Sequence, residues 1–298
     1  MPGLVIRSQS GFFGVKTEEG LLVCKLRGRL KQGRREGDLA AIGDRVNVSL
    51  VADGKGFIES VDPRHSMISR MAPLPRGEYE QIIIANPDQI ILIFACAQPE
   101  PRLRMLDRFL IIAEHQIIPS VIVANKTDLV TDEQARQLFG HYADIGYPLI
   151  YSSVPEKRGI DQLKNLLTGK ISAFAGPSGA GKSSLLNAIQ PGLGLSIQNV
   201  SQTTGKGKHT TVSSELFPVK GGGYVADTPG LKALALWDIE PEELDGYFPD
   251  IRPHVAQCQF SDCTHVHEPG CAVIDAVETG KINPQRYDSY LRLRFEDQ

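Results

Sequence analysis

A glycine-rich segment near the middle of the chain has the pattern of a phosphate-binding loop. Gly176-Pro177-Ser178-Gly179-Ala180-Gly181-Lys182-Ser183 fits GxxxxGK[ST] and lies between the apolar run Ile171–Ala175 and the helix-like stretch Ser184–Ile189. Glycines let backbone N–H groups converge on phosphate oxygens, and a helix N-terminus adds its dipole. We expect Lys182 to reach the β- and γ-phosphates and Ser183 to bind Mg²⁺. An ordinary glycine-rich turn is the simpler alternative, which the strand–loop–helix context disfavours.

A second polar segment fits recognition of a guanine base. Asn125-Lys126-Thr127-Asp128 follows the apolar run Val121–Ala124 and matches the pattern NKxD. The Asp128 carboxylate can accept hydrogen bonds from guanine N1–H and N2–H₂, which adenine does not offer in that place. Asn125 can meet the other edge of the base, and the Lys126 stem can cover the ring. Taken alone, the segment also fits a strand-to-helix loop in which Asp128 is a helix cap.

A third segment fits the binding of Mg²⁺ and a γ-phosphate. Asp227-Thr228-Pro229-Gly230 follows the short apolar strand Tyr224–Ala226 and matches DxxG. Asp227 would hold Mg²⁺ through water, and the Gly230 N–H would meet the γ-phosphate. The alternative is a simple β-turn, since Asp, Pro and Gly are common turn residues.

Two weaker signals complete this set. Ser152 and Ser153 close an apolar strand and can supply backbone N–H groups to guanine O6. The polar segment Ser201–Thr211 has the composition of a mobile loop, and either Thr210 or Thr211 can complete the Mg²⁺ shell. The residues expected to contact the nucleotide or its Mg²⁺ are Asn125, Lys126, Asp128, Ser152, Ser153, Gly176, Ser178, Gly179, Ala180, Gly181, Lys182, Ser183, Ser184, Thr210, Thr211, Asp227 and Gly230.

The order of these motifs along the chain is itself informative. An ordinary GTPase has the phosphate loop first, then a switch threonine, DxxG and finally NKxD. Here NKxD comes first, at 125–128, and DxxG comes last, at 227–230. The same sheet can form if the old termini are joined and a new break opens after DxxG. The γ-phosphate-sensing loop then leads directly into the C-terminal region, so we expect nucleotide state to influence that region.

Three cysteines and two histidines near the C-terminus predict a metal site. Cys258-x₄-Cys263-x-His265-x₅-Cys271 supplies three thiolates and one imidazole, a common set for structural Zn²⁺. Four protein ligands complete a tetrahedron and leave no open position for catalysis. His267 competes with His265, and the spacing favours neither. Buried thiols without a metal are the alternative, although a small acidic segment has little core and would gain from a metal cross-link.

Composition and charge limit the class of protein. Of the 298 residues, 41% are hydrophobic and 22% are charged, which is typical of globular chains. Apolar runs such as Ile90–Phe94 are strand-sized, well short of the roughly 18 residues of a membrane helix. Five cysteines, an odd number, without a secretory signal favour a reducing, cytoplasmic compartment. The net charge of −3 is the sum of +5 (13 basic, 8 acidic) over 1–76, 0 over 77–237 and −8 (5 basic, 13 acidic) over 238–298, which suggests distinct modules.

The first 65 or so residues read as a small β-barrel. Turns rich in glycine and aspartate separate short alternating segments, namely Gly11–Val15, Leu21–Leu30, Arg45–Val51 and Gly56–Val61. If residues 21–31 form one strand, its period of two places four basic residues on one face, namely Lys25, Arg27, Arg29 and Lys31. Such a row is usually only a solvated face, and nucleic-acid binding is the functional alternative.

The middle of the chain alternates between strands and helices. Residues 64–80, rich in proline and arginine, read as a basic linker without secondary structure. The strands expected after it are Ile90–Phe94, Val121–Ala124, Leu149–Tyr151 and Ile171–Ala175, and the helices are Arg102–His115, Asp132–Ile145 and Asp161–Leu167. This alternation predicts a parallel sheet with helical crossovers. From about Trp237 a third region begins, which ends in a helix expected over Pro284–Glu296.

Together these motifs and their order resemble the RsgA/YloQ family of circularly permuted, ribosome small-subunit-dependent GTPases, over nearly all 298 residues. The resemblance implies an N-terminal OB-fold barrel, a role in late maturation of the small ribosomal subunit, and GTP hydrolysis stimulated by that subunit. It also favours His265 over His267 as the zinc ligand. Because OB barrels bind oligonucleotides on one face, it favours rRNA contact for the basic row, through phosphates and therefore with strong salt dependence.

The residue after DxxG predicts an unusual catalytic arrangement. Many GTPases place a glutamine there to orient the attacking water, but here the position is Leu231, which cannot form a hydrogen bond. His209, beside the switch threonines, is the best local candidate, since an imidazole can orient or deprotonate water near neutral pH. In similar proteins a histidine in the pattern Gly-x-His-Thr-Thr is assigned this role. In this chain the pattern reads Gly207-Lys208-His209-Thr210-Thr211. The alternative is a solvated loop residue or an RNA contact.

The sequence therefore predicts an α/β protein with three modules: an OB-fold RNA-binding barrel over 1–65, a circularly permuted P-loop GTPase domain over 66–236, and a zinc-binding domain over 237–298. We expect a cytoplasmic monomer that uses GTP or GDP, Mg²⁺ and one structural Zn²⁺. Its expected partners are the small ribosomal subunit and its rRNA, without a membrane, and its catalytic residues are His209 and Lys182. The rivals are a non-catalytic, nucleotide-dependent RNA-binding protein and an ATP-using P-loop enzyme, against which Asp128 argues.

Overall fold

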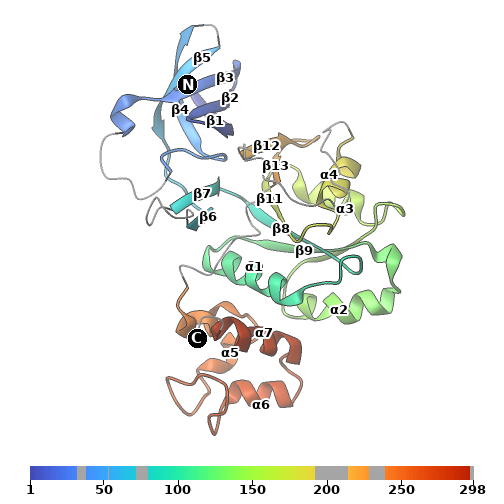
Figure 1. Cartoon of the computed structure of the whole chain (residues 1–298). Helices are drawn as coiled ribbons and strands as arrows, with labels where there is room; N and C mark the ends of the chain where they lie inside the picture. The colour runs from blue at the N-terminus through green and yellow to red at the C-terminus, as the bar shows by residue number, and fades with distance from the viewer. Residues whose placement is uncertain (32–37, 53, 72–79, 192–213, 228–238, 296–298) are drawn as a thin grey trace, which may run out of the picture.

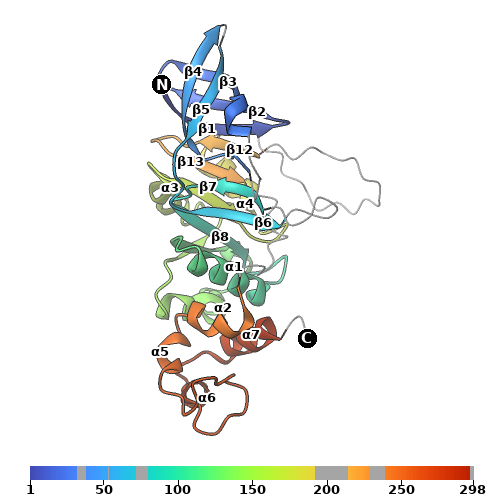
Figure 2. The same cartoon turned by 90° about the vertical axis from the view of Figure 1, so that its left-hand side faces the viewer.

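The computed structural model describes residues 1–31, 38–52, 54–71, 80–191, 214–227 and 239–295. Three parts follow one another along the molecule: an N-terminal barrel, a central α/β domain and a small helical C-terminal module (Figures 1 and 2). The barrel and the C-terminal module lie at opposite ends, with the α/β domain between them. Among the described residues, no helix is both long and apolar enough to cross a membrane.

The N-terminal barrel has five strands: β1 (Pro2–Gln9), β2 (Phe12–Thr17), β3 (Gly20–Leu26), β4 (Arg45–Ala52) and β5 (Lys55–Val61). They pair in the order β1-β2-β3-β5-β4, and pairing of β1 with β4 closes the barrel. Side chains alternate in burial along each strand, and Val15, Cys24 and Ile58 are fully buried in the barrel core. The predicted barrel is confirmed, and β1 is an additional strand that was not predicted.

The predicted basic strand face is wrong. Strand β3 ends at Leu26, and residues Gly28–Lys31 form a 3₁₀ helix (η1) instead of continuing the strand. Arg27 and Arg29 both form ion pairs with Glu59 of β5, at 2.8 and 3.2 Å. A turn at the Gly28 position therefore breaks the period of two, and one carboxylate neutralises part of the expected row.

The predicted linker over 64–80 is also partly wrong. Strands β6 (Met67–Met71) and β7 (Glu80–Ala85) pair as an antiparallel hairpin next to the central domain. Prolines at 73 and 75 suggested an unstructured segment, but they fall in 72–79, outside the described residues. Ile68 and Ile84 are buried in the central core, and this burial stabilises a short strand that its flanking prolines had obscured.

The central domain contains a mostly parallel sheet, as predicted. Its strands are β8 (Gln89–Ala95), β9 (Ser120–Asn125), β10 (Leu149–Ser152), β11 (Ile171–Ala175), β12 (Ser214–Pro218) and β13 (Tyr224–Asp227), in the order β10-β9-β8-β11-β13-β12. All neighbours are parallel except β12, which runs antiparallel to β13. The helices are α1 (Leu103–His115), α2 (Asp132–Asp144), α3 (Ile160–Leu167) and α4 (Lys182–Ile189), with a short 3₁₀ helix η2 (Thr127–Leu129). The expected strands and helices are confirmed to within about two residues.

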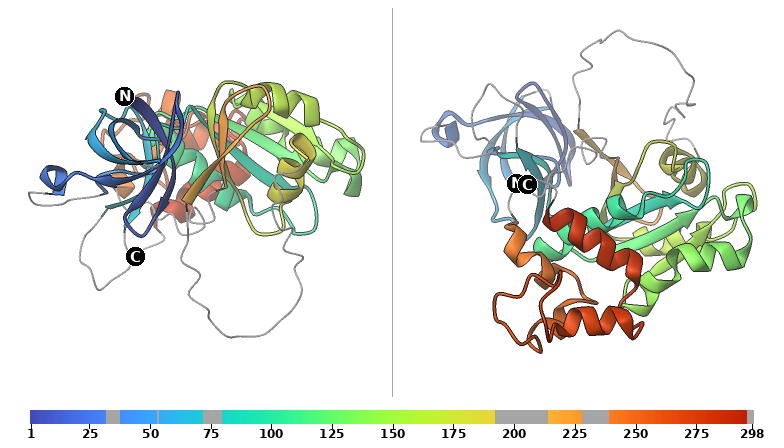
Figure 3. Two further views of the ribbon diagram at one scale, coloured as in Figure 1. Left: turned by 90° about the horizontal axis from the view of Figure 1, so that it is seen from above. Right: turned by 60° about the horizontal axis from the view of Figure 1, so that its bottom comes forward.

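Helices cover both faces of this sheet (Figure 3). Alternate residues of β8 face opposite layers: Leu92 and Phe94 pack with α1 and α2, whereas Ile91 and Ile93 pack with α3 and α4. Strands buried on both faces read as continuous apolar runs, which is why the sequence located them well. Helix α2 begins with a capping box in which Thr131 and Gln134 satisfy each other's backbone N–H groups.

The C-terminal module has few regular elements: a 3₁₀ helix η4 (Pro241–Tyr247), α5 (Arg252–Val255), α6 (Ala272–Glu278) and α7 (Pro284–Arg294). The predicted terminal helix is confirmed up to Arg294, and it begins with Asn283 as a side-chain cap and proline at its first position. The module packs against α1, whose Ile111 lies in the same buried cluster as Phe248 and Tyr290.

The barrel sheet and the central sheet are joined edge to edge. Strand β1 pairs antiparallel with β12, with Arg7 opposite Glu215 and Ser8 opposite Ser214. The segment of 192–213 that precedes β12 lies outside the described residues. The strand that follows the expected switch threonines in sequence is thus also the strand that meets the barrel.

Candidate nucleotide site and metal site

Three of the predicted segments meet at one edge of the central sheet. Strands β9, β10, β11 and β13 all run in the same direction, so their carboxyl ends lie together. The segments 125–128, 152–153 and 176–183 come at the ends of β9, β10 and β11. Ligands in open α/β sheets bind at such an edge, and these segments are the ones that the sequence assigned to base and phosphates. Asp227 ends β13, with its backbone in register with Phe174 of β11.

The phosphate loop runs from β11 into α4, which begins at Lys182. The Lys182 Nζ donates to the carbonyl oxygens of Gly176 and Pro177, each at 2.9 Å, so its charge lies within the loop. Ser183 and Ser184 lie in the first turn of α4, where backbone N–H groups have no partner inside the helix. This geometry can bind an anionic group through amides, the helix dipole and one ammonium group.

Asn125 joins the base-reading segment to the phosphate loop. Its Nδ2 donates to the Ala180 carbonyl oxygen at 2.8 Å, and its Oδ1 accepts from the Ser152 hydroxyl at 2.9 Å. Gly181 has φ of 96°, and a Cβ there would lie 2.3 Å from the Asn125 Nδ2, so only glycine fits. Buried Asn125 and Ser152 are therefore held rigidly, and they fix the distance between the two parts of the site.

The carboxylate of Asp128 is exposed and oriented. The Ser153 hydroxyl donates to its Oδ1 at 2.7 Å, and the Oδ2 atom has no such restraint from Ser153. Lys126 adopts a left-handed backbone conformation (φ 61°), and its Nζ donates to the Gln98 carbonyl oxygen. These contacts place an acceptor and a lysine stem side by side at the end of β9, as reading a guanine base requires.

One expected donor is not supported by this geometry. The backbone N–H of Ser153 donates to the Arg158 carbonyl oxygen at 3.1 Å, so it is already used within its own loop. The two serines act here through their hydroxyl groups, which bond to Asn125 and Asp128. The sequence had proposed them as backbone donors because a strand end alone does not show which atoms are engaged.

Several predicted residues lie outside the described residues: His209, Thr210, Thr211, Gly230 and Leu231. For Asp227 the structure describes only the backbone. Their expected roles in hydrolysis and Mg²⁺ binding stay predictions from the sequence.

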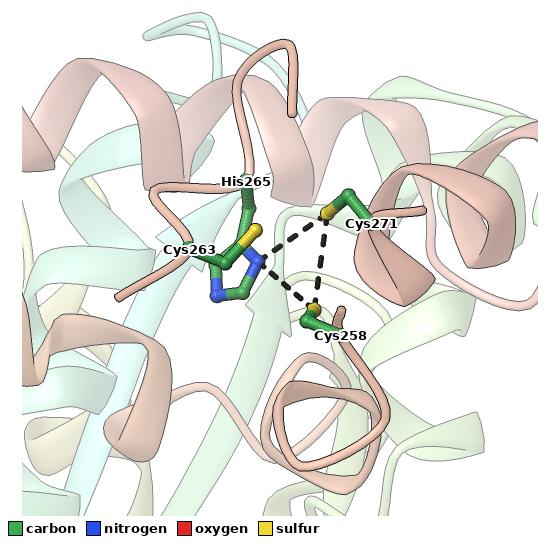
Figure 4. A group of neighbouring side chains, drawn as sticks. All are labelled: Cys258, Cys263, His265 and Cys271. Atoms are coloured by element: carbon green, nitrogen blue, oxygen red, sulfur yellow. Dashed lines mark hydrogen bonds between the residues drawn. The ribbon is translucent and has the colours of Figure 1, made fainter. Parts of the chain in front are cut away.

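The four predicted metal ligands come together in the C-terminal module (Figure 4). The ligand atoms of Cys258, Cys263, His265 and Cys271 all lie within 4.8 Å of one another. His265 is fully buried, whereas His267 is exposed and is not part of the group. The structure therefore decides between the two histidines that the spacing left open.

The distances within this group fit a tetrahedral zinc site. His265 Nδ1 lies 3.5 Å from the Cys258 sulfur and 3.4 Å from the Cys271 sulfur, and those two sulfurs are 4.0 Å apart. Bond lengths of about 2.3 Å to sulfur and about 2.05 Å to nitrogen give tetrahedron edges of about 3.8 Å between two sulfurs and about 3.6 Å between sulfur and nitrogen. Burial raises the pKa of the Cys263 thiol to about 12 and also raises the pKa of Cys271. Without a metal these thiols stay protonated, and a bound cation would replace their protons.

A carboxylate shapes the loop that carries two of these ligands. Glu268 accepts hydrogen bonds from the backbone N–H groups of Thr264, Val266 and His267, at 2.8, 2.9 and 3.1 Å. Burial alone would raise the pKa of Glu268, but the hydrogen bonds from Thr264 and the loop amides lower it well below its usual value. Glu268 was not predicted from the sequence, although a Glu-Pro-Gly turn just before Cys271 was a usable signal.

The fold and the nucleotide site define a P-loop GTPase in which the NKxD strand precedes the phosphate loop. The RsgA GTPase family matches residues 61–237, and the RsgA N-terminal domain matches residues 2–58. The small ribosomal subunit biogenesis GTPase RsgA of Gemmatimonas aurantiaca is 43% identical, over 99% of this chain and 96% of the relative. That of Moorella thermoacetica is 44% identical, over 99% and 97%.

Solved structures agree with these relatives. YjeQ from Thermotoga maritima superimposes with a TM-score of 0.78 at 38% identity, covering 99% of this chain and 97% of that one. YloQ, described as a circularly permuted GTPase, gives 0.74 at 33% identity, covering 99% and 94%. The chain belongs to the RsgA GTPase family, whose chemistry implies GTP or GDP and Mg²⁺. The predicted permutation and enzyme class are confirmed.

Proposed function

We propose that this protein hydrolyses GTP as a nucleotide-gated factor in maturation of the small ribosomal subunit, acting as a monomer in the cytoplasm. The observation that carries the proposal is the hydrogen-bonded chain from Ser152 through Asn125 to the Ala180 carbonyl, which unites base and phosphate segments in one site. The names of its full-length relatives supply the ribosomal role.

The proposed modules are 1–65, 66–236 and 237–298. Family matches over 2–58 and 61–237 support cuts near these positions. In this division the barrel contacts rRNA, the central domain hydrolyses GTP, and the C-terminal domain holds one structural Zn²⁺ on Cys258, Cys263, His265 and Cys271.

For base recognition, we assign guanine N1–H and N2–H₂ to the Asp128 carboxylate. The Ser153 hydroxyl already occupies one lone pair of Oδ1 and restrains the carboxylate, which keeps further lone pairs on both oxygens for the base. Asn125 and the stem of Lys126 complete the contact with the base. Adenine has no proton on N1 and no amino group on C2, so it cannot supply these two donors to the carboxylate, which favours GTP over ATP.

For the phosphates, the backbone N–H groups of the loop between Gly176 and Ser184, except at Pro177, and the Lys182 ammonium would stabilise the charge that develops while water attacks the γ-phosphate. Lys182 exchanges its carbonyl partners for phosphate oxygens, which are stronger, charged acceptors. Ser183 and, through water, Asp227 would hold Mg²⁺, and Thr210 or Thr211 would join them when the γ-phosphate is present. The Gly230 amide would donate to the γ-phosphate.

Water activation falls to His209. Leu231 occupies the position where many GTPases have glutamine, and a leucine side chain cannot orient water. An imidazole next to the switch threonines can do so at neutral pH. The lack of glutamine also explains why a partner surface would be needed to complete the site.

The first experiment measures phosphate release from Mg·GTP by the purified protein alone, with small ribosomal subunits, and with large subunits as the matched control. Strong stimulation by the small subunit alone is expected. Equal rates in all three conditions would point to a GTPase with another partner. No release in any condition would favour the non-catalytic, nucleotide-dependent RNA-binding protein.

Two variants then test the residues. His209→Ala should lose the stimulated turnover while keeping GTP affinity, because the imidazole acts on water and not on the nucleotide. Asp128→Asn should weaken GTP binding by roughly 10- to 100-fold, the loss expected for a hydrogen bond to a charged group. The affinity of Asp128→Asn for ATP should equal that of the wild type, because adenine makes no hydrogen bonds to Asp128. Unchanged GTP binding by Asp128→Asn would remove Asp128 from the base site.

A further inference from the structure

The two ring nitrogens of His265 face different partners. Figure 4 shows one nitrogen turned toward the sulfurs of Cys258 and Cys271, which lie 3.5 and 3.4 Å from Nδ1. The other nitrogen, Nε2, lies 3.1 Å from the Asp245 Oδ2. Asp245 belongs to η4, outside the ligand segment 258–271, and it lies 20 residues before the histidine in sequence.

A metal-binding imidazole must be neutral, so the nitrogen that does not bind the metal carries the proton. A carboxylate that accepts this N–H fixes both the tautomer and the direction of the ring. We propose that Asp245 is the positioning residue of the metal site: it accepts the Nε2–H of His265 and thereby presents Nδ1 to Zn²⁺. This inference rests on the zinc site of the proposed function.

Burial and backbone support make this contact more than a surface pair. The His265 side chain is 0% exposed and that of Asp245 only 16%. The backbone of His265 is held in a left-handed conformation (φ 62°), where its carbonyl oxygen accepts from the Tyr287 hydroxyl at 2.5 Å. With the backbone held in this way, rotation of the ring is the main remaining freedom, and the Asp245 carboxylate restrains it.

The contact also connects the metal site to the GTPase domain. Leu244, next to Asp245, is buried in the same cluster as Ile111 of α1. Tyr247 of η4 packs edge-on against His115 of α1, with 5.2 Å between the ring centroids. Bound metal would therefore stabilise η4 through His265 and Asp245, and with it the surface between the C-terminal module and α1.

The test measures zinc retention by the full-length protein against a chromogenic chelator. Asp245→Ala should lower zinc affinity about 10- to 100-fold, as loss of a carboxylate partner does at other zinc sites. Asp245→Asn, which keeps an acceptor oxygen, should lose less. Glu243→Gln removes an exposed charge from the same 3₁₀ helix and should leave zinc affinity unchanged. GTP affinity, read in parallel, should stay constant in all three variants and shows that the central domain is folded.

A second readout is independent of affinity. Nitrogen NMR of ¹⁵N-histidine-labelled, zinc-loaded protein should show His265 bound through Nδ1 with a slowly exchanging Nε2–H, and this proton should exchange faster in Asp245→Ala. Binding through Nε2, or equal zinc retention by wild type and Asp245→Ala, would overturn the inference. A wild-type protein that binds no zinc would instead overturn the zinc site of the proposed function.

Discussion

The barrel and the C-terminal module are attached to the same central domain by different chemistry. At the barrel, the contacts are mainly backbone pairing of β1 with β12 and apolar packing, with Ile42 of the barrel side buried in the central core, and the ion pair across the β1–β12 edge is exposed. At the C-terminal module, Arg286 of α7 lies between Asp107 of α1 and Asp250, at 2.5 and 2.7 Å. All three side chains are at most 2% exposed.

Because of this difference, the two junctions should respond differently to substitution of single side chains. Backbone hydrogen bonds and apolar contacts depend weakly on the identity of single polar side chains. A buried ion cluster depends on every member, because removal of one partner leaves another charge without compensation in a low dielectric. Burial by itself would lower the pKa of Arg286, but Asp107 and Asp250 raise it above its usual value, so the arginine stays charged.

The largest expected effect comes from removing the proposed Zn²⁺ from the C-terminal module. Structural zinc binding supplies most of the folding free energy of small metal domains. Chelation should therefore abolish hydrogen-exchange protection in α6 and α7, whereas β2 to β5 of the barrel should keep theirs. Loss of protection in both modules at once would show that the two junctions are coupled and not independent.

The second largest effect is expected from breaking the ion cluster of Arg286 with Asp107 and Asp250. Arg286→Ala should destabilise the attachment of α7 by about 3–5 kcal/mol, because Asp107 and Asp250 are then buried without the arginine that compensates their charges. The local unfolding free energy from hydrogen exchange of α7 amides measures it. Arg292→Ala is the matched control: Arg292 is exposed on the same helix and pairs with Asp288, so its loss should cost about 0.5 kcal/mol.

On the barrel side, a backbone substitution should have a larger effect than the loss of an exposed ion pair. Gly43 has φ of 89°, and a Cβ there would lie 1.9 Å from the Ala85 carbonyl oxygen of β7. Gly43→Ala should destabilise the barrel junction by at least about 1–3 kcal/mol from backbone strain alone. The readout is hydrogen exchange of β1 and β7, with Gly28→Ala, where a Cβ meets no atom, as the control. A harmless Gly43→Ala would mean that the barrel can separate from β7 freely.

The smallest effect is expected for the exposed ion pair between Arg7 and Glu215 at the β1–β12 edge. Glu215→Ala should change stability by about 0–1 kcal/mol and should do so only at low salt, since water and ions screen such pairs. Thermal unfolding of wild type and variant at low and high ionic strength measures this. A large effect that persists in high salt would contradict the division between the two junctions.

Local sequence signals located the site well. The phosphate loop, its strand Ile171–Ala175 and the NKxD segment were predicted in place, because each depends on neighbours a few residues away and on buried strands that read as apolar runs. Predictions failed where tertiary contact competed with local pattern. The predicted basic strand face was wrong because the chain turns after Leu26 and forms η1. The strand Met67–Met71 was not predicted because nearby prolines suggested a linker, whereas burial of Ile68 in the central core stabilises a strand.

The sequence by itself determined the chemistry of this protein: which residues can cradle phosphates, read a base and ligate a metal, and in what permuted order they come. Only the tertiary structure decided which atoms meet. It placed His265 and not His267 among the thiols, turned the hydroxyls of Ser152 and Ser153 toward Asn125 and Asp128, and brought Arg286 to Asp107 across 179 residues. Such pairs have no periodicity or spacing to reveal them, because their geometry depends on how whole elements pack.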